Sequence, residues 1–393
     1  MTVQIAKKLS MLERSATDEI DNIVRQMAMT GINDIISFGG GEPCFDTPAN
    51  IQEAAVEALH NGKTKYEPTC GDYQLREEIC KKLQRKNGIN TTPENIVVTP
   101  GGKFAAYLTF QTLLNPGDKV MLLEPAWVSY EAMARLAGAE AVHIPSYEEN
   151  GFLPDLDEIS RSFEPSVRLV VINSPCNPTG AVYPPELIKA IAQIADRHGA
   201  MVVSDEIYED ILYKGVHYSA GADFENVITL NGFSKSFAMT GWRLGYLNAP
   251  LEVVEGMIKI YQHSATCVNS FAQGGAIEAL RSEESAQATR RMAEGYRERC
   301  DLITDLMQET GFFKGFAPQG AFYAFPSYTM KKSSLEVATL LLEQAHVATV
   351  PGSAFGACGE GHLRFAYSTS KENIVEAFRR ISDLFTKLAG KRN

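Results

Sequence analysis

Lys235 lies in a setting that could make a lysine catalytic. It follows the apolar run Val227–Leu230 through the small-residue turn Asn231-Gly232-Phe233-Ser234. A free lysine amine has a pKa of about 10.4 and is a poor nucleophile at neutral pH. An amine held as an imine to an aldehyde cofactor is already activated, and once displaced it can move protons. The alternative is a solvated surface lysine, which the preceding strand and turn disfavour.

Asp205 and Tyr208 follow a second apolar run, Met201–Ser204. A carboxylate at the end of a buried strand is costly unless a cation meets it. A protonated pyridine nitrogen would be such a cation, and the pairing would turn the ring into an electron sink. Tyr208 could donate a hydrogen bond to an oxygen on the same ring. The alternative is a helix N-cap aspartate beside a half-buried tyrosine.

Asn177 lies in the segment Asn173–Gly180, which contains two prolines and a glycine. These residues restrict the backbone, so the Asn177 side chain is presented rigidly. As a neutral donor it could bind a ring oxygen. A plain structural turn is the alternative.

Arg243, Arg364 and Trp127 are candidates for ligand binding. Guanidinium groups bind phosphate and carboxylate with two parallel hydrogen bonds. Arg364 lies inside the apolar run Leu363–Tyr367, where an unpaired charge is expensive, so an internal salt bridge is the alternative. Trp127 could stack on an aromatic cofactor or pack in the core.

The elements that must position these residues have the composition of buried strands. Their near-continuous Val, Ile and Leu content is typical of strands covered on both faces. They are Asn95–Thr99, Lys119–Leu123, Ala141–Ile144, Arg168–Asn173, Met201–Ser204, Val227–Leu230 and Trp242–Leu247, with helical stretches over Phe104–Leu114 and Pro185–His198. The alternation predicts an α/β fold with a mainly parallel, doubly wound sheet. Ligands bind beyond the carboxyl ends of such strands, so the segments after them should form one site.

The pattern changes after about residue 280. The predicted elements there are a long polar helix over Glu283–Gly311, the apolar segment Phe322–Phe325, a helix over Leu335–Ala345, strands near Ala348 and over Leu363–Tyr367, and a last helix from Lys371. We expect a large domain over residues 46–280. Residues 1–45 and 281–393 should form a smaller α+β domain.

The composition excludes several classes of protein. The 393 residues are 45% apolar and 22% charged, which is ordinary for a globular protein, and the formal charge of −11 argues against a nucleic-acid binder. Seven cysteines without a C-x-x-C pair indicate neither a disulfide framework nor a metal site. The start lacks a signal peptide, and no apolar run approaches the roughly 20 residues that cross a bilayer. We therefore expect a cytoplasmic protein that binds no metal and no membrane.

The sequence lacks three other known motifs: a dinucleotide-binding fingerprint, a phosphate-binding loop and the nucleophile elbow of serine hydrolases. Gly39-Gly40-Gly41 is not a dinucleotide fingerprint, because the third glycine position is Cys44. Gly102-Lys103 is not a phosphate loop, because the flanking positions are Val97 and Phe104. Gly232-Phe-Ser-Lys-Ser236 lacks the last glycine of a nucleophile elbow.

The ordered motifs Asn177-Pro-Thr-Gly180, Asp205-Glu-Ile-Tyr208 and Ser234-Lys-x-Phe-x-Met-Thr-Gly-Trp-Arg243 carry a family resemblance. From about Ser15 to the last helix, the chain resembles the class I/II aminotransferases of pyridoxal-phosphate fold type I, and most closely their bacterial aspartate aminotransferase subgroup. The resemblance implies pyridoxal 5'-phosphate as cofactor, transamination between an L-amino acid and a 2-oxo acid such as 2-oxoglutarate, and a homodimer with shared active sites.

The same resemblance assigns roles by position. Those at the cofactor are Lys235 as the imine-forming lysine and proton shuttle, Asp205 on the pyridine nitrogen, Asn177 and Tyr208 on the ring oxygen, Trp127 on the ring face, and Arg243, Ser234, Gly102, Lys103 and the neighbouring subunit's Tyr66 on the phosphate. The substrate would contact Arg364 through its α-carboxylate, with Gly41, Asn177, Trp127, Ser15, Thr17 and Lys103 nearby. Many relatives carry a phosphate-binding serine where this chain has Gly232, so Ser234 or the backbone must replace it.

The sequence identifies the substrate less directly than the cofactor. One subgroup recognises dicarboxylates with an arginine in the segment that matches Gln262–Ser270, where this chain has none. Ser15, Thr17 and Lys103 match the other subgroup, which predicts aspartate and glutamate, although Ser15 and Thr17 could instead cap the first helix. Phe104 and the extra glycine at position 40 depart from that pattern. An aromatic, alanine or broad specificity therefore stays open, as does a cysteine-conjugate β-lyase.

Overall fold

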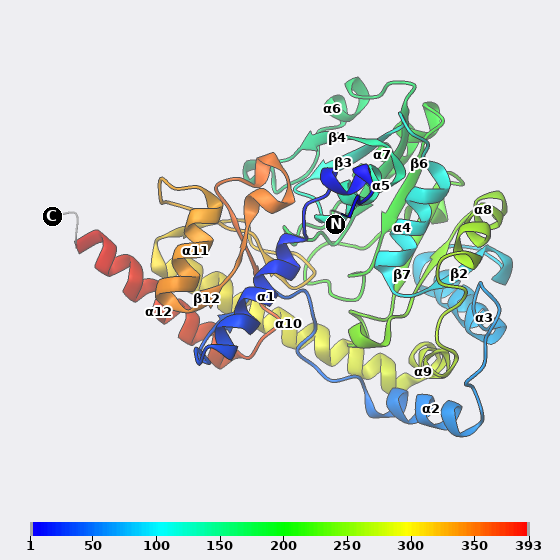
Figure 1. Cartoon of the computed structure of the whole chain (residues 1–393), viewed down its shortest axis with the longest axis horizontal. Helices are drawn as coiled ribbons and strands as arrows, with labels where there is room; N and C mark the ends of the chain where they lie inside the picture. Colours follow the sequence, from blue (N-terminus) through cyan, green and yellow to red (C-terminus); the bar gives the residue numbers. More distant parts are fainter. Residues whose placement is uncertain (1–2, 391–393) are drawn as a thin grey trace.

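The computed structural model describes residues 3–390, and its largest sheet confirms the α/β prediction (Figure 1). Seven strands lie in the order β2-β8-β7-β6-β5-β3-β4. Their bounds are β2 (Ile96–Thr99), β3 (Lys119–Glu124), β4 (Glu140–Pro145), β5 (Val167–Asn173), β6 (Met201–Asp205), β7 (Val227–Gly232) and β8 (Gly245–Asn248). Strands β3 to β7 pair in parallel, and only β8 runs antiparallel to its neighbours β2 and β7.

Alternate side chains of these strands pack into two separate apolar clusters. Met121, Val170 and Val202 point toward α6 and α7, whereas Val120 and Leu169 point toward α4, α5 and α8. Both faces of the sheet are therefore covered, which explains the unbroken apolar runs. The helices of this part are α2 (Ala49–His60), α3 (Tyr73–Lys82), α4 (Gly102–Leu113), α5 (Ser129–Ala137), α6 (Leu156–Arg161), α7 (Pro185–Arg197), α8 (Leu251–Gln262) and α9 (Ser270–Arg281).

One strand boundary differs from the sequence prediction. The apolar pattern predicts a strand from Trp242, but β8 begins only at Gly245. Thr240–Trp242 forms a short 3-10 turn, and Arg243 follows with a φ of 55°, in the left-handed region. A residue in that conformation cannot continue an extended strand, so the strand starts after it.

The C-terminal part contains three long helices and small sheets. Its elements are α10 (Glu283–Thr310), α11 (Ser334–Ala345), α12 (Lys371–Gly390), β9 (Phe313–Lys314), β10 (Tyr323–Ala324), β11 (Ser327–Tyr328), β12 (Val347–Ala348), β13 (Val350–Pro351) and β14 (Leu363–Ala366). Helix α10 extends from α12 to α9 and α2 and so connects the two ends of the molecule (Figure 1).

The N-terminal segment packs against this C-terminal part. Strand β1 (Ile36–Ser37) pairs in parallel with β12, and the Phe38 N–H donates to the Ala348 carbonyl at 2.8 Å. Before it lie a 3-10 turn, η1 (Lys7–Met11), and helix α1 (Ala16–Met29). The pairing places β1 where the sequence predicts the first 45 residues, but η1 contacts α5 of the sheet-containing part, where Arg135 donates to the Met11 carbonyl at 2.8 Å. The domain boundaries themselves stay a prediction. Among residues 3–390, no helix combines the length and apolar character needed to cross a bilayer.

Candidate active site

A cavity of about 330 Å³ lies at the carboxyl ends of β5, β6 and β7. This is the edge of the sheet at which the sequence predicts a site. The expected residues that line it are Lys235, Asp205, Tyr208, Asn177, Trp127, Gly102, Lys103, Arg243, Ser234, Arg364, Gly41 and Thr17. The fold therefore brings together residues from the N-terminal helix, the sheet and the C-terminal part.

Two expected residues lie outside the cavity. The Ser15 hydroxyl contacts Thr17 Oγ1 at 2.8 Å and accepts a hydrogen bond from the Asp18 N–H at the start of α1. Its side chain thus acts as a helix cap, the alternative interpretation of this residue. Tyr66 is 87% exposed and does not line this chain's cavity. Roles for both residues at the site stay predictions.

Lys235 presents its amine to the cavity from the loop after β7. The Nζ atom donates to the Gly41 carbonyl and lies 5.8 Å from the centre of the Phe322 ring. Burial lowers the pKa of Lys235 to about 8, with Arg243 and Arg364 acting in the same direction and Glu42 opposing them. At pH 7 about a tenth of such amines are neutral, against roughly one in three thousand at the ordinary pKa. The amine can therefore act as a base and a nucleophile.

Asp205 ends β6 with its carboxylate at the cavity. Its Oδ2 accepts a hydrogen bond from the Tyr130 hydroxyl at 2.6 Å, and its Oδ1 accepts one from the Ile207 N–H at 3.2 Å. Burial raises the pKa of Asp205, although these hydrogen bonds oppose the shift. A cationic group on a ligand would stabilise the ionised carboxylate. The sequence analysis missed Tyr130, which lies 75 residues away along the chain.

Tyr208 is held by a second residue that the sequence analysis missed. Its hydroxyl hydrogen-bonds to the Tyr323 hydroxyl at 2.7 Å, and both side chains are buried. Tyr323 lies in the apolar segment Phe322–Phe325, which was predicted only as part of the small domain. A tyrosine inside a buried run requires a polar partner, and that requirement was the available signal.

Arg364 is a buried cation without a carboxylate partner. It is 1% exposed, and among residues 3–390 no carboxylate oxygen lies within 4.0 Å of its guanidinium. Instead it donates to Asn177 Oδ1 at 3.1 Å and to the Gly39 carbonyl, while its Nε has no partner in the described chain. The predicted alternative of an internal salt bridge is therefore wrong. Such a group is poised to bind an anion that enters the cavity.

A second anion-binding position forms where Arg243 meets the start of α4. The guanidinium donates to the Thr240 carbonyl at 2.8 Å and the Pro100 carbonyl at 3.3 Å. Gly101 has a φ of 82°, and a Cβ there would collide with the Arg243 side chain. Helix α4 begins at Gly102, and the free N–H groups at a helix N-terminus favour a phosphate. Ser234 also faces this space.

Gly232 does not open to this cavity. It pairs with Gly245 of β8, and a Cβ on it would lie 3.1 Å from the Gly245 Cα and 3.2 Å from the Leu244 carbonyl oxygen. A serine there would require β8 to shift. In place of a serine at position 232, Ser234 and the α4 N-terminus would bind the phosphate.

Comparison with known proteins identifies the family. A sequence profile described as "Aminotransferase class I and II" matches residues 33–381. This chain belongs to the class I and II aminotransferases. It is 42% identical over 381 residues, 96% of this chain and 98% of the relative, to the aspartate/prephenate aminotransferase of Thermus thermophilus. It is 44% identical to aromatic-amino-acid aminotransferase 2 of Thermococcus litoralis, covering 89% of this chain and 92% of that one.

The solved structures agree with the family assignment. The aspartate aminotransferase from Thermus thermophilus with maleate superposes with a TM-score of 0.94 at 41% identity, covering 98% of this chain and all of that one. The fold is thus the pyridoxal-phosphate fold type I predicted from the sequence. Aminotransferases of this family use pyridoxal 5'-phosphate to move an amino group between an amino acid and a 2-oxo acid.

The described residues fit this cofactor. Its phosphate would meet the Arg243 guanidinium and the α4 N-terminus, and its basic ring nitrogen would meet the buried Asp205 carboxylate. Its aldehyde would meet the amine of Lys235, whose lowered pKa favours the reactive neutral form. The uncompensated Arg364 is left for a carboxylate of the substrate.

Proposed function

We propose that this aminotransferase transfers the amino group of L-aspartate or L-glutamate to a 2-oxo acid such as 2-oxoglutarate, with Lys235 as the catalytic base and acid. One observation carries the proposal. A lysine with a pKa of about 8 and a buried arginine without a carboxylate partner share one cavity. The names of two relatives, the aspartate/prephenate aminotransferase of Thermus thermophilus and the aspartate aminotransferase of Pyrococcus horikoshii, support the substrate class.

In this mechanism Arg364 and Lys235 act on the same amino acid. Pyridoxal phosphate, when bound, supplies an aldehyde that reacts with amines and a ring that accepts an electron pair. Arg364 binds the α-carboxylate with two parallel hydrogen bonds and thereby orients the α-carbon. The neutral amine of Lys235 would accept the α-proton of the amino acid, and the resulting ammonium would act as the acid when the proton is returned.

The surrounding residues fix the geometry. The Tyr130 hydroxyl and the Ile207 N–H hold the Asp205 carboxylate, which would bind the ring nitrogen. Tyr323 holds the Tyr208 hydroxyl, which would bind the ring oxygen. The Trp127 indole lines the cavity and would stack on the ring.

The Lys103 side chain is positioned to determine substrate specificity. It lies at the mouth of the cavity with its Nζ 5.2 Å from the centre of the Trp127 ring, and Thr17 of α1 lines the same cavity. A side-chain carboxylate of the substrate would meet this ammonium and the Thr17 hydroxyl. The aromatic aminotransferase of Thermococcus litoralis supports an aromatic specificity as the second candidate. A cysteine-conjugate β-lyase would use the same residues and differ only in the fate of the carbanion.

Replacing Lys103 by alanine tests this assignment. We expect kcat/KM for L-aspartate to fall about tenfold, the loss of one charge-assisted hydrogen bond, while kcat/KM for L-phenylalanine stays within twofold. Lys119→Ala is the matched control, because Lys119 pairs with Glu164 outside the cavity. Equal losses for both amino acids would contradict the role of Lys103. A wild type that prefers L-phenylalanine or L-alanine would contradict the substrate class.

We also propose a homodimer in which Tyr66 reaches the phosphate site of the partner subunit. In the single chain this phenol is 87% exposed and is therefore accessible to a partner subunit. The expected molar mass in solution is twice 43.2 kDa, and Tyr66→Ala should raise the Kd for the cofactor. A fully active 43.2 kDa monomer would contradict the proposal.

A further inference from the structure

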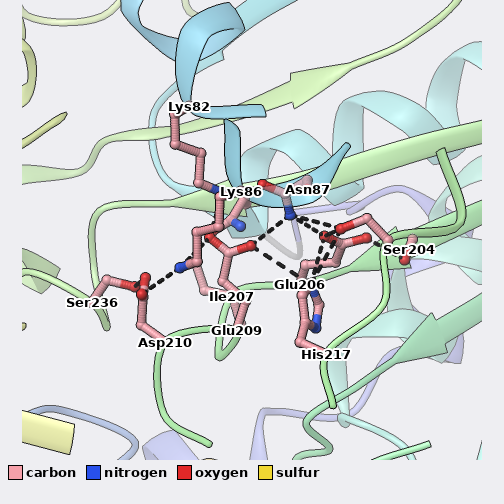
Figure 2. Close-up of polar contacts among 12 residues, drawn as sticks. Lys82, Lys86, Asn87, Ser204, Glu206, Ile207, Glu209, Asp210, His217 and Ser236 are labelled. Carbon is pink, nitrogen blue, oxygen red and sulfur yellow. Dashed lines mark hydrogen bonds and ion pairs between the residues drawn. The ribbon is translucent and has the colours of Figure 1, made fainter. Parts of the chain in front are cut away.

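Figure 2 shows a largely buried ionic cluster beside the segment that carries Asp205 and Tyr208, and we call it the rear network. It consists of Lys82, Lys86, Asn87, Ser204, Glu206, Glu209, Asp210, His217, Ser219 and Ser236. Successive side chains at the end of a strand point to opposite faces of the sheet. Asp205 therefore faces the cavity, whereas Glu206, which is 1% exposed, faces the rear network.

Glu206 is held by four donors. Its Oε1 accepts a hydrogen bond from the Ser204 hydroxyl at 2.9 Å. Its Oε2 accepts from the Ser219 hydroxyl at 2.6 Å and the Asn87 Nδ2 at 3.0 Å, and it lies 3.1 Å from the His217 Nε2. A carboxylate with this many partners has one fixed position. The backbone that it shares with Asp205 is therefore fixed as well.

Glu209, the residue after Tyr208, is held in the same way. Its carboxylate contacts the Lys82 ammonium, lies 3.2 Å from the Lys86 Nζ and accepts a hydrogen bond from the Asn87 Nδ2 at 2.7 Å. Burial alone would raise the pKa of Glu209, but the neighbouring cations lower it well below its usual value. The carboxylate is therefore ionised and firmly paired.

The third carboxylate links the rear network to the loop that carries Lys235. Asp210 contacts the Lys86 ammonium and accepts a hydrogen bond from the Ser236 hydroxyl at 2.6 Å. Ser236 directly follows Lys235. Asp205, Tyr208 and Lys235 thus each have a chain neighbour that the rear network holds.

Two carboxylates of the rear network already have cationic partners. Ligand atoms of Glu206, Glu209 and His217 lie within 4.8 Å of one another, the spacing of a cation site. However, the ammonium groups of Lys82 and Lys86 already contact Glu209. Burial would lower the pKa of His217, but the hydrogen bond to Glu206 and the charges of Glu206 and Glu209 raise it overall. The two lysine ammonium groups thus pair with Glu209 and Asp210 inside the cluster.

Asn87 occupies the centre of this cluster because of an unusual helical turn. Residues Leu83–Asn87 form a π-helical turn, η2, after α3, and Gly88 ends it with a φ of 72°. A π turn closes between residues five apart, so Lys82 and Asn87 both reach Glu209. The single Asn87 Nδ2 contacts Glu206, Glu209 and also Ser219 at 2.7 Å, as Figure 2 shows for the two carboxylates.

We propose that Asn87 is a positioning residue for the transamination reaction. It ties Glu206 and Glu209 to the end of α3 and so fixes the short segment from which Asp205 and Tyr208 face the cavity. Removing this amide leaves two buried carboxylates with fewer donors and lets the segment shift. A small displacement of groups that hold a cofactor lowers both its affinity and the rate of the reaction. The inference rests on the proposed roles of Asp205 and Tyr208.

Asn87→Ala is the test, and Asn50 provides a matched control. The Asn50 Nδ2 also contacts one glutamate and two serines, Glu278, Ser282 and Ser285, none of which lines the cavity. We expect Asn87→Ala to raise the Kd of the apoprotein for pyridoxal phosphate about tenfold and to lower kcat about tenfold, with KM for L-aspartate unchanged within twofold. Asn50→Ala should lower the melting temperature to a similar extent and leave Kd and kcat unchanged within twofold.

The outcomes separate this inference from the proposed function. If Asn87→Ala keeps the wild-type Kd and kcat, or if Asn50→Ala changes them equally, the rear network only stabilises the fold and the inference is wrong. If Asn87→Ala does not fold, Glu206→Gln replaces it, because the glutamine keeps the volume but presents an amide to the donors of Asn87 and Ser219. The same tenfold changes are expected, and unchanged values overturn the inference. A wild-type protein that binds no pyridoxal phosphate overturns the proposed function itself.

Discussion

Lys235→Ala is expected to lower kcat for transamination by about 10⁴-fold or more. The variant loses the amine that binds the cofactor and the group that moves the α-proton, and general acid–base catalysis alone contributes about 10²–10⁴-fold. The steady-state rate with L-aspartate and 2-oxoglutarate measures the loss. Other residues of the cavity are expected to have smaller effects, because none of them takes part in proton transfer at the α-carbon.

Lys235→Arg is the control for this prediction. Arginine keeps the positive charge and much of the volume, but its guanidinium does not lose a proton in proteins. We therefore expect Lys235→Arg to be as inactive as Lys235→Ala. An arginine variant that keeps a tenth or more of the wild-type kcat would contradict the account, because the charge rather than the neutral amine would then be the essential property.

The second large effect is expected at Arg364. Replacement by methionine should lower kcat/KM for L-aspartate about 10²–10³-fold, since the substrate carboxylate would lose both hydrogen bonds to the guanidinium in a buried site. The same variant should keep its melting temperature within a few degrees. In the unliganded protein the guanidinium has no carboxylate partner, and replacing a buried charge by an apolar group of similar volume is often neutral.

This combination distinguishes binding from folding. A structural arginine would lower the melting temperature and the activity together when it is removed. Calorimetry and steady-state kinetics on the same preparation give the melting temperature and kcat/KM. Arg364→Lys serves as an intermediate variant, because lysine keeps the positive charge but cannot form the two parallel hydrogen bonds of a guanidinium group. A large loss of thermal stability with little change in kcat/KM would assign Arg364 to the fold instead.

The sequence predicted the parts of the site that depend on local order. Asn177, Asp205 and Lys235 each follow an apolar run, and parallel strands bring their carboxyl ends to one edge of the sheet. The same reasoning located the seven strands to within one or two residues, except at the start of β8, which the left-handed Arg243 delays by three residues. Local composition carries this information because buried strands must be apolar.

The sequence did not predict contacts between side chains that are distant along the chain. Tyr130 and Tyr323 bind Asp205 and Tyr208 across 75 and 115 residues, and Asn87 binds Glu206 across 119. No periodicity specifies which buried hydroxyl or amide will face which partner, because that depends on how whole elements pack. For the same reason the sequence left open whether Arg364 has a salt-bridge partner, which only its three-dimensional surroundings decide.

The central claim, that Lys235 holds pyridoxal phosphate and that the chain accepts an amino group from aspartate or glutamate, is tested most directly by one spectroscopic titration. The purified protein, loaded with pyridoxal phosphate, is mixed with L-aspartate in the absence of any 2-oxo acid. We predict that the absorbance band of the aldehyde form gives way to that of the amine form and that one 2-oxo acid is released per site. In Lys235→Ala this spectral change should not occur on the time scale of the wild-type reaction. A wild-type protein that develops no cofactor band, or whose band no amino acid changes, would contradict the account.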